Sequence, residues 1–247
     1  YPISLNELVQ TYGKIETQRS LAERLIYGMY PAVVRGDDDP RQILEDYCEG
    51  ILFKDIFSLT GIRKAKQFLG LVQMLAYRIG SEINYDNLAR ETGLSKHAVS
   101  DYIDLLEQCF IIKRCNSFAR NLDNELKKGK KIYFCDLGIR NALIRNFSPL
   151  NARTDVGGIW ENFAYMERQK FHNETRSFAE TFFWRTTGND PKEIDFIEVT
   201  DGKIQLFECK YSNKAKASVP KVFQQTYGVQ EIHLITPQNI LNFCTSG

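Results

Sequence analysis

Two acidic residues and a lysine, Asp195, Glu208 and Lys210, have the types and the spacing for metal-assisted chemistry. The segments around them are rich in β-branched and aromatic residues and meet at Asp201-Gly202, a pair that favours a two-residue hairpin turn. Such a turn places Asp195 directly opposite Glu208 on the neighbouring strand. Because side chains two positions apart along a strand share a face, we expect all three side chains on one face.

The rest of that face is predicted to be apolar core, and like charges placed opposite each other on a sheet destabilise the pair. The two carboxylates therefore need a compensating charge, which a divalent cation that prefers oxygen ligands, Mg²⁺ or Mn²⁺, would supply. Lys210 would hold a water near the metal. The alternative is an exposed hairpin end with Glu193–Lys210 as a surface ion pair, which would contribute little. The apolar residues predicted on this face are Ile197, Val199, Ile204 and Leu206.

Longer strings around these residues carry a family resemblance. Ile194-Asp195 and Glu208-Cys209-Lys210 resemble the catalytic motif of the PD-(D/E)XK nuclease-like superfamily. Nearly the whole chain resembles the C-terminal half of a group of bacterial and archaeal AAA-type ATPases, whose C-terminal domain has no assigned function. The strings that carry this second resemblance are Trp184-Arg185-Thr186, Glu193-Ile194-Asp195-Phe196, Phe207-Glu208-Cys209-Lys210, Tyr133-Phe134-Cys135-Asp136-Leu137-Gly138-Ile139-Arg140 and Gly158-Ile159-Trp160-Glu161-Asn162-Phe163.

The resemblance to the nucleases implies roles for particular residues. Asp195, Glu208 and the backbone carbonyl of Cys209 would bind Mg²⁺ or Mn²⁺, and Lys210 would orient the attacking water. A helix before the core strands commonly contributes one acid in that superfamily, and Glu161 occupies the matching position. The alternative for Glu161 is a favourable charge in the first turn of a helix.

The order of the predicted elements agrees with that resemblance. We expect strands at 181–186, 193–200, 203–212 and 231–236, with helices at 159–170 and 219–227. This α-β-β-β-α-β order is the core order of the nuclease-like fold. Gln224, on the later helix, is a further candidate polar residue of the site.

Residues 67–120 are predicted to form a winged helix. Ala89 in a first helix, Gly93 in a turn and Ser95 at the start of a second helix match helix-turn-helix spacing. Lys96 at the start of the second helix, with Lys113 and Arg114 in the wing, would contact phosphates.

Acidic residues argue against DNA contact, because Asp101 and Asp104 lie on the same second helix. A winged helix that packs against protein as a spacer is therefore the alternative, and a transcriptional regulator would require sequence-specific DNA binding by this module. The basic connection at 121–131 is predicted to be a solvated loop, with a track for a phosphate backbone as its alternative.

Composition restricts the class of protein. Hydrophobic residues make up 43% and charged residues 26% of the 247 residues, as in ordinary globular proteins, and the net charge of +1 predicts no global attraction to nucleic acid. Six cysteines without a C-x-x-C motif indicate a reduced, cytoplasmic protein, and no run of residues predicts a membrane span. The chain starts without Met, so we expect a piece of a longer protein.

The sequence also lacks the phosphate-binding loop G-x-x-x-x-G-K-[ST], so ATP is expected to bind only elsewhere in the parent chain. We predict three parts: a helical segment left from an ATPase lid (1–66), the winged helix (67–120) and a PD-(D/E)XK restriction-endonuclease-like α/β domain (121–247). The leading hypothesis is Mg²⁺-dependent phosphodiester hydrolysis in nucleic acid. The alternative is a non-catalytic domain that binds DNA or protein, so whether the chain is an enzyme stays open.

Overall fold

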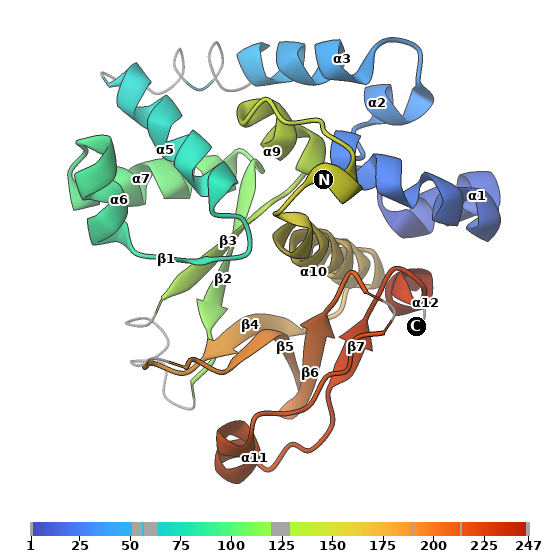
Figure 1. Cartoon of the computed structure of the whole chain (residues 1–247), viewed down its shortest axis with the longest axis vertical. Helices are drawn as coiled ribbons and strands as arrows, with labels where there is room; N and C mark the ends of the chain where they lie inside the picture. The colour runs from blue at the N-terminus through green and yellow to red at the C-terminus, as the bar shows by residue number, and fades with distance from the viewer. Residues whose placement is uncertain are drawn as a thin grey trace.

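A computed structural model describes residues 2–50, 56, 64–119, 129–188, 190–212 and 214–245. The fold is mixed α/β: helices come first, and a seven-stranded mixed sheet with interspersed helices follows within the described residues (Figure 1). Residues 121–128 of the predicted basic connection lie outside the described residues.

The N-terminal helices begin at residues that satisfy free backbone N–H groups. The hydroxyl of Ser4 accepts a hydrogen bond from the Glu7 N–H at 3.1 Å, and the Ser4 N–H donates to the Glu7 carboxylate at 2.7 Å. These two reciprocal hydrogen bonds form a capping box. The helices of this region are α1 (Leu5–Tyr27), α2 (Pro31–Arg35), α3 (Pro40–Tyr47) and α5 (Ala65–Tyr77).

A helix-turn-helix follows α5. Gly93 ends the first helix with φ of 70°, and the Ser95 hydroxyl accepts from the Ala98 N–H at the start of the second helix, so both predicted local features are confirmed. The chain then enters two paired antiparallel strands. The elements are β1 (Glu82–Ile83), α6 (Tyr85–Thr92), α7 (Lys96–Gln108), β2 (Ile112–Ser117), β3 (Lys130–Phe134) and α9 (Leu137–Leu143).

The C-terminal elements occur in the predicted α-β-β-β-α-β order, with one more helix at the end. They are a short 3₁₀ helix (Leu150–Ala152), α10 (Val156–Thr175), β4 (Glu180–Arg185), β5 (Glu193–Thr200), β6 (Lys203–Cys209), α11 (Lys221–Tyr227), β7 (His233–Ile235) and α12 (Ile240–Thr245).

The β5–β6 hairpin has the predicted turn and register. Asp201 and Gly202 both have positive φ, at 50° and 76°, as this type of two-residue turn requires. Thr200 pairs with Lys203, and the same register continues to Phe196 opposite Phe207. The pairing ends there, one step before Asp195 and Glu208, so the placement of these two residues opposite each other stays a prediction.

A β-bulge interrupts the other edge of β5, where it pairs with β4. Phe182 pairs with Ile197 but Trp184 pairs with Ile194, so β5 carries one extra residue in this interval. Ile194 and Ile197 consequently pack into the same apolar cluster, although strict alternation would separate them. The predicted sharing of one face by Asp195 and Ile197 therefore does not hold at the bulge.

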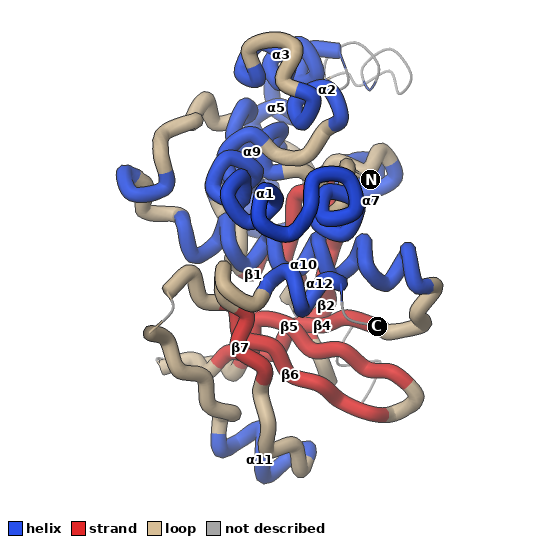
Figure 2. Tube along the Cα trace, turned by 90° about the vertical axis from the view of Figure 1, so that its right-hand side faces the viewer, coloured by secondary structure: helices blue, strands red, loops and turns tan. Residues whose placement is uncertain are grey.

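The seven strands of the described residues belong to one sheet, in the order β1-β3-β2-β4-β5-β6-β7. The predicted boundary at 120/121 falls between β2 and β3, which pair with each other, and β2 pairs in parallel with β4. Helices α10 and α12 cover one face of the sheet, while α11 lies on the opposite side (Figures 1 and 2). Residues of α10 and α12 share a large core with Phe196 and Phe207, whereas Phe223 of α11 packs with Ile197.

Candidate functional site

Asp195, Glu208 and Lys210 lie together at the end of the β5–β6 hairpin. The Asp195 carboxylate accepts a hydrogen bond from the Cys209 backbone N–H at 2.7 Å through Oδ2. The ammonium of Lys210 lies 2.6 Å from Oε1 of Glu208. Asp195 is 9% exposed, and the side chains of Glu208 and Lys210 are 18% and 45% exposed, so the site opens toward solvent on the Lys210 side.

Burial and mutual repulsion act on both carboxyls. Burial raises the pKa of Asp195, opposed by the charge of Lys131 and by the hydrogen bond from Cys209. Burial also raises the pKa of Glu208, and the nearby charge of Asp195 raises it further. Because both pKa values are raised, this end of the hairpin disfavours two negative charges without a compensating cation.

A lysine that sequence reasoning had placed in a solvated loop lies at the centre of the site. Lys131, on β3, is completely buried, and its Nζ lies 2.7 Å from Oε1 of Glu161 on α10. It also forms an ion pair with Glu193 at the start of β5. The hydroxyl of Tyr133, two residues along β3, donates to the same Glu161 oxygen at 2.6 Å. The loop prediction for Lys131 is wrong because the strand begins at Lys130.

Glu161 is a buried acid with a raised pKa. Helix α10 begins at Val156, earlier than predicted, so Glu161 is not in its first turn and the helix-terminus explanation for its charge is wrong. Burial raises the pKa of Glu161 to about 7, with Lys131 opposing and Asp195 adding to the shift. Its other oxygen lies against Gly80, where an added Cβ would come within 3.2 Å. One carboxylate oxygen of Glu161 therefore bonds Lys131 and Tyr133, and the other packs against Gly80.

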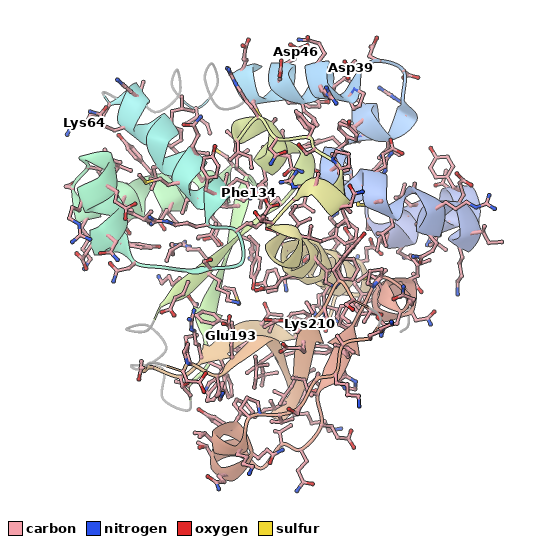
Figure 3. All side chains as sticks on the ribbon, in the orientation of Figure 1. Asp39, Asp46, Lys64, Phe134, Glu193 and Lys210 are labelled. Atoms are coloured by element: carbon pink, nitrogen blue, oxygen red, sulfur yellow. The ribbon has the colours of Figure 1, made fainter. Side chains whose placement is uncertain are left out.

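We define the acidic cluster as Lys131, Glu161, Glu193, Asp195, Glu208 and Lys210. The labelled Glu193 and Lys210 lie at the end of the sheet below α10 (Figure 3). The surface pair Glu193–Lys210, offered as the alternative from sequence, does not form, because Glu193 pairs with Lys131 and Lys210 pairs with Glu208. At the rim, Arg185 lies 3.9 Å from Glu193. Four carboxylates therefore meet three cations.

The donor atoms of the cluster fit one mode of metal binding and not another. Among the described residues, no group of three or more His, Cys, Asp or Glu side chains is arranged to hold a metal ion, which argues against a closed structural site. Mg²⁺ commonly uses only one or two protein carboxylates, with waters and substrate phosphates completing its shell. Oδ1 of Asp195 and Oε2 of Glu208 remain for such an ion, because the hydrogen bonds of the described residues engage the other oxygen of each.

The structure separates the three residues predicted to contact DNA. Arg114 forms ion pairs with Asp104 and Glu107 of α7, so its guanidinium is occupied within the protein. Lys96 forms an exposed pair with Asp86 at 2.8 Å, and Lys113 is partly buried on β2. Of the three, Lys96 is the most open to a phosphate.

Two further candidates lie around the hairpin. The backbone N–H of Cys209 donates to Asp195, and its side chain packs in the core shared with α10. Gln224 lies on α11, across the sheet from α10, and the interactions recorded for the described residues do not join its side chain to the acidic cluster.

Sequence reasoning missed Lys131 and Tyr133 as residues of the site. A signal was present, because Lys131 directly precedes the apolar run Ile132-Tyr133-Phe134-Cys135, and strand alternation places Lys131 and Tyr133 on one face. The bulge also left a trace, since Ile194 and Ile197 are three residues apart and both apolar.

A second buried charged network provides a reference. We define the arginine cluster as Arg140, Asn141, Arg153 and Asp155, in which Asp155 lies 2.6 Å from Arg140 and 2.8 Å from Arg153. Further guanidinium N–H groups donate to the carbonyls of Ala76 and Asn146, each within 2.8 Å, and to the Asn141 side chain at 3.0 Å.

With this geometry described, comparison with known proteins shows the family. The chain belongs to the family defined by a domain of unknown function (DUF8612), whose model matches residues 18–150. Residues 156–244 match a second domain of unknown function (DUF4143). The second match contains α10, the β5–β6 hairpin and therefore most of the acidic cluster, whereas Lys131 lies in the first.

Similar proteins come from archaea and bacteria. The uncharacterized protein MJ1544 of Methanocaldococcus jannaschii is 25% identical over 216 residues, which cover 83% of this chain and 46% of that protein. An uncharacterized protein of Haemophilus influenzae is 25% identical over 155 residues, covering 58% of this chain and 38% of that protein. The chain thus spans less than half the length of these relatives. No solved structure matches it. Among the described residues, no helix has the length and apolarity needed to cross a membrane.

Proposed function

We propose that this chain is the C-terminal portion of an AAA-type ATPase and that its acidic cluster hydrolyses phosphodiester bonds in nucleic acid with Mg²⁺ or Mn²⁺. The observation that carries the proposal is the pair of carboxylates on adjoining strands, Asp195 and Glu208, each with one oxygen available and with Lys210 beside them. The α-β-β-β-α-β order supports a PD-(D/E)XK nuclease-like domain, and the helix-turn-helix followed by paired strands supports a winged helix.

The roles follow from where the side chains lie. Asp195 and Glu208 would hold the cation, with the Cys209 carbonyl as a further ligand. The cation would lower the pKa of a bound water and neutralise charge on the phosphate. Lys210 is half exposed and bonded to Glu208, so its ammonium can reach a water or a phosphate oxygen at the mouth of the site. Glu161 would act on the site through its contact with Lys131.

The parent protein would supply ATP binding, since this sequence has no phosphate-binding loop. Relatives more than twice the length of the matched region leave space for such a domain. The partners we propose are nucleic acid and the ATPase domain of the same chain. Of the cations predicted for DNA contact, Lys96 is the best placed, through an exposed ammonium at the start of α7.

A second function has an observation in its favour. Lys131 and Tyr133 already neutralise or bond Glu161, and no set of three ligating side chains converges among the described residues. Both features suit a nuclease-like fold that binds DNA or protein without cleaving it. In that case the acidic cluster would be structural.

Cleavage assays separate the two functions. We expect the wild-type chain to cleave single- or double-stranded DNA with Mn²⁺, Asp195→Asn to lose both Mn²⁺ binding and cleavage, and Lys210→Ala to lose cleavage while still binding Mn²⁺. Lys214→Ala, an exposed lysine in the following loop, is the matched control and should cleave as the wild type does. A wild-type protein that does not bind Mn²⁺ and does not cleave DNA under these conditions would favour the non-catalytic function.

A further inference from the structure

Lys131 is a positive charge enclosed among negative ones. Its side chain has no exposed surface, and it reaches Glu161 on α10 and Glu193 on β5 from its own strand β3. Lysine is rarely fully buried unless it is paired, because removing an ammonium from water has a large free-energy cost. The ion pairs with Glu161 and Glu193 therefore fix the position of the Lys131 ammonium, and the ammonium in turn fixes these two carboxylates.

The charge of Lys131 also acts on the proposed metal ligands. Among the charges near Asp195, that of Lys131 has the largest effect, ahead of Lys210. Lys131 thus supplies part of the positive charge that the two carboxylates need.

The backbone at Lys131 is held in place by strands on both sides. Lys131 pairs with Cys115 on β2 and with Glu82 on β1, so β3 is held on both sides. Its ammonium lies 5.5 Å from the centre of the Phe183 ring, a favourable cation–π distance. A divalent ion would therefore enter the cluster with this ammonium still present.

We propose that Lys131 is a positioning residue of the acidic cluster and a built-in counter-ion that lowers the affinity of the neighbouring carboxylates, Asp195 and Glu208, for a divalent cation. The inference rests on the metal site of the proposed function. Lys131 holds Glu161 and Glu193 away from the ion and repels it, so the affinity for the ion is set lower than two carboxylates alone would give. A substrate phosphate, which brings its own negative charge, would then favour binding of the ion.

Mn²⁺ titration of the full chain tests this role directly. Isothermal titration calorimetry and thermal melts are run on the wild type, on Lys131→Met and on the matched control Lys130→Met. Lys130 is the neighbouring lysine on β3, and its ammonium lies over the Tyr85 ring instead of in the acidic cluster. NaCl of equal ionic strength replaces MnCl₂ in a parallel series, which separates specific binding from screening.

We expect Lys131→Met to bind Mn²⁺ at least about tenfold more tightly than the wild type, because a like charge has been removed beside the ion. Lys130→Met should match the wild type. Binding by Lys131→Met alone would also support the role, since it would show that the ammonium excludes the ion.

Equal Mn²⁺ affinities in the wild type and Lys131→Met would overturn the inference and leave the metal site standing. Absence of binding in both would overturn the metal site and the inference together. If Lys131→Met fails to fold in chelator, millimolar Mn²⁺ should restore the fold whereas NaCl should not. Failure of Mn²⁺ to restore it would show that Lys131 serves packing only.

Discussion

The acidic cluster and the arginine cluster are both buried networks of charged side chains, but they balance charge differently. In the arginine cluster two guanidinium groups share Asp155, and further N–H groups of both arginines donate to backbone carbonyls and to Asn141. In the acidic cluster carboxylates outnumber the cations, and Asp195 and Glu208 each have an oxygen beyond those already bonded. An excess of positive charge whose N–H groups bond backbone carbonyls indicates a structural network. An excess of negative charge whose carboxylate oxygens are available indicates a binding site.

The largest expected effect is on the structural side of this comparison. Arg140→Met removes a guanidinium that is 1% exposed and bonds Asp155, Asn141 and the Ala76 carbonyl. Breaking a buried ion pair typically costs about 3–5 kcal/mol, so we expect a loss of that size in the free energy of unfolding, measured with urea. The control is Arg35→Met, whose exposed pair with Asp37 at 3.3 Å should contribute about 0–1 kcal/mol. Equal losses in both variants would contradict the structural role.

The two clusters should also respond to pH in opposite directions. Burial raises the pKa of Glu161 from 4.5 to about 7, so the folded state binds a proton that the unfolded state releases in this range. Stability contributed by this group is present below pH 4.5 and is lost as the pH rises toward 7, by up to about 3 kcal/mol. Glu161→Gln should flatten that part of the profile, with urea unfolding between pH 4 and 8 as the measurement.

Asp155 gives the opposite sign in a lower window. Despite burial, its hydrogen bonds to Arg153 and Arg140 lower the pKa of Asp155 below its ordinary value of 3.8. Its contribution to stability is therefore present above pH 3.8 and is lost as the pH falls below it. Asp155→Asn should remove this acid-side loss and leave the slope between pH 4.5 and 7 unchanged. A change in that slope would show that the two clusters are not independent.

Asp195 should tolerate an amide better than a methyl group. Its carboxylate accepts the Cys209 N–H at 2.7 Å, and an asparagine carbonyl oxygen can accept the same bond while removing one negative charge. We expect Asp195→Asn to stay within about 1 kcal/mol of the wild type or to be slightly more stable. Asp195→Ala leaves a buried N–H without its acceptor and should lose about 1–3 kcal/mol. Thermal melts in chelator compare the two, and a large loss in Asp195→Asn would make the negative charge itself structural.

The smallest effect concerns the helix-turn-helix. Lys96 is exposed and Arg114 is occupied by Asp104 and Glu107, so Lys96 should contribute more to DNA binding than Arg114. Lys96→Ala should reduce the salt dependence of duplex binding by about one ion, whereas Arg114→Ala should leave that slope unchanged. Fluorescence anisotropy across a NaCl series measures both. Salt-independent binding, or none at low salt, would favour the spacer alternative.

Local features were predictable from sequence. The Asp201-Gly202 turn sets its own register through the positive φ values it needs, and the caps at Ser4 and Ser95 depend on residues within one helical turn. The order of the C-terminal elements was predictable from hydrophobic periodicity, which is also a local property of the chain. Each of these features depends on residues close together in the chain.

The composition of the site was less predictable because tertiary pairing decides it. Lys131 reaches Glu161 only because β3 joins the sheet that β5 extends, and the motif around Asp195 contains no trace of that pairing. Asp195 likewise turns toward Cys209 at a bulge that depends on pairing with β4. Sequence reasoning therefore found the carboxylates and missed the lysine between them.

Calorimetric titration of Mn²⁺ into the wild type, Asp195→Asn and Glu208→Gln tests the central claim most directly, with circular dichroism to check that each variant is folded. The account predicts saturable binding to the wild type and its loss in both variants, because each removes one of the two available carboxylates. Thermal stabilisation by Mn²⁺ should follow the same pattern, at about 2.7 kcal/mol when the ion is at a hundred times its Kd. A folded wild type that binds no Mn²⁺, or variants that bind it as tightly, would contradict the claim that the acidic cluster is a metal site.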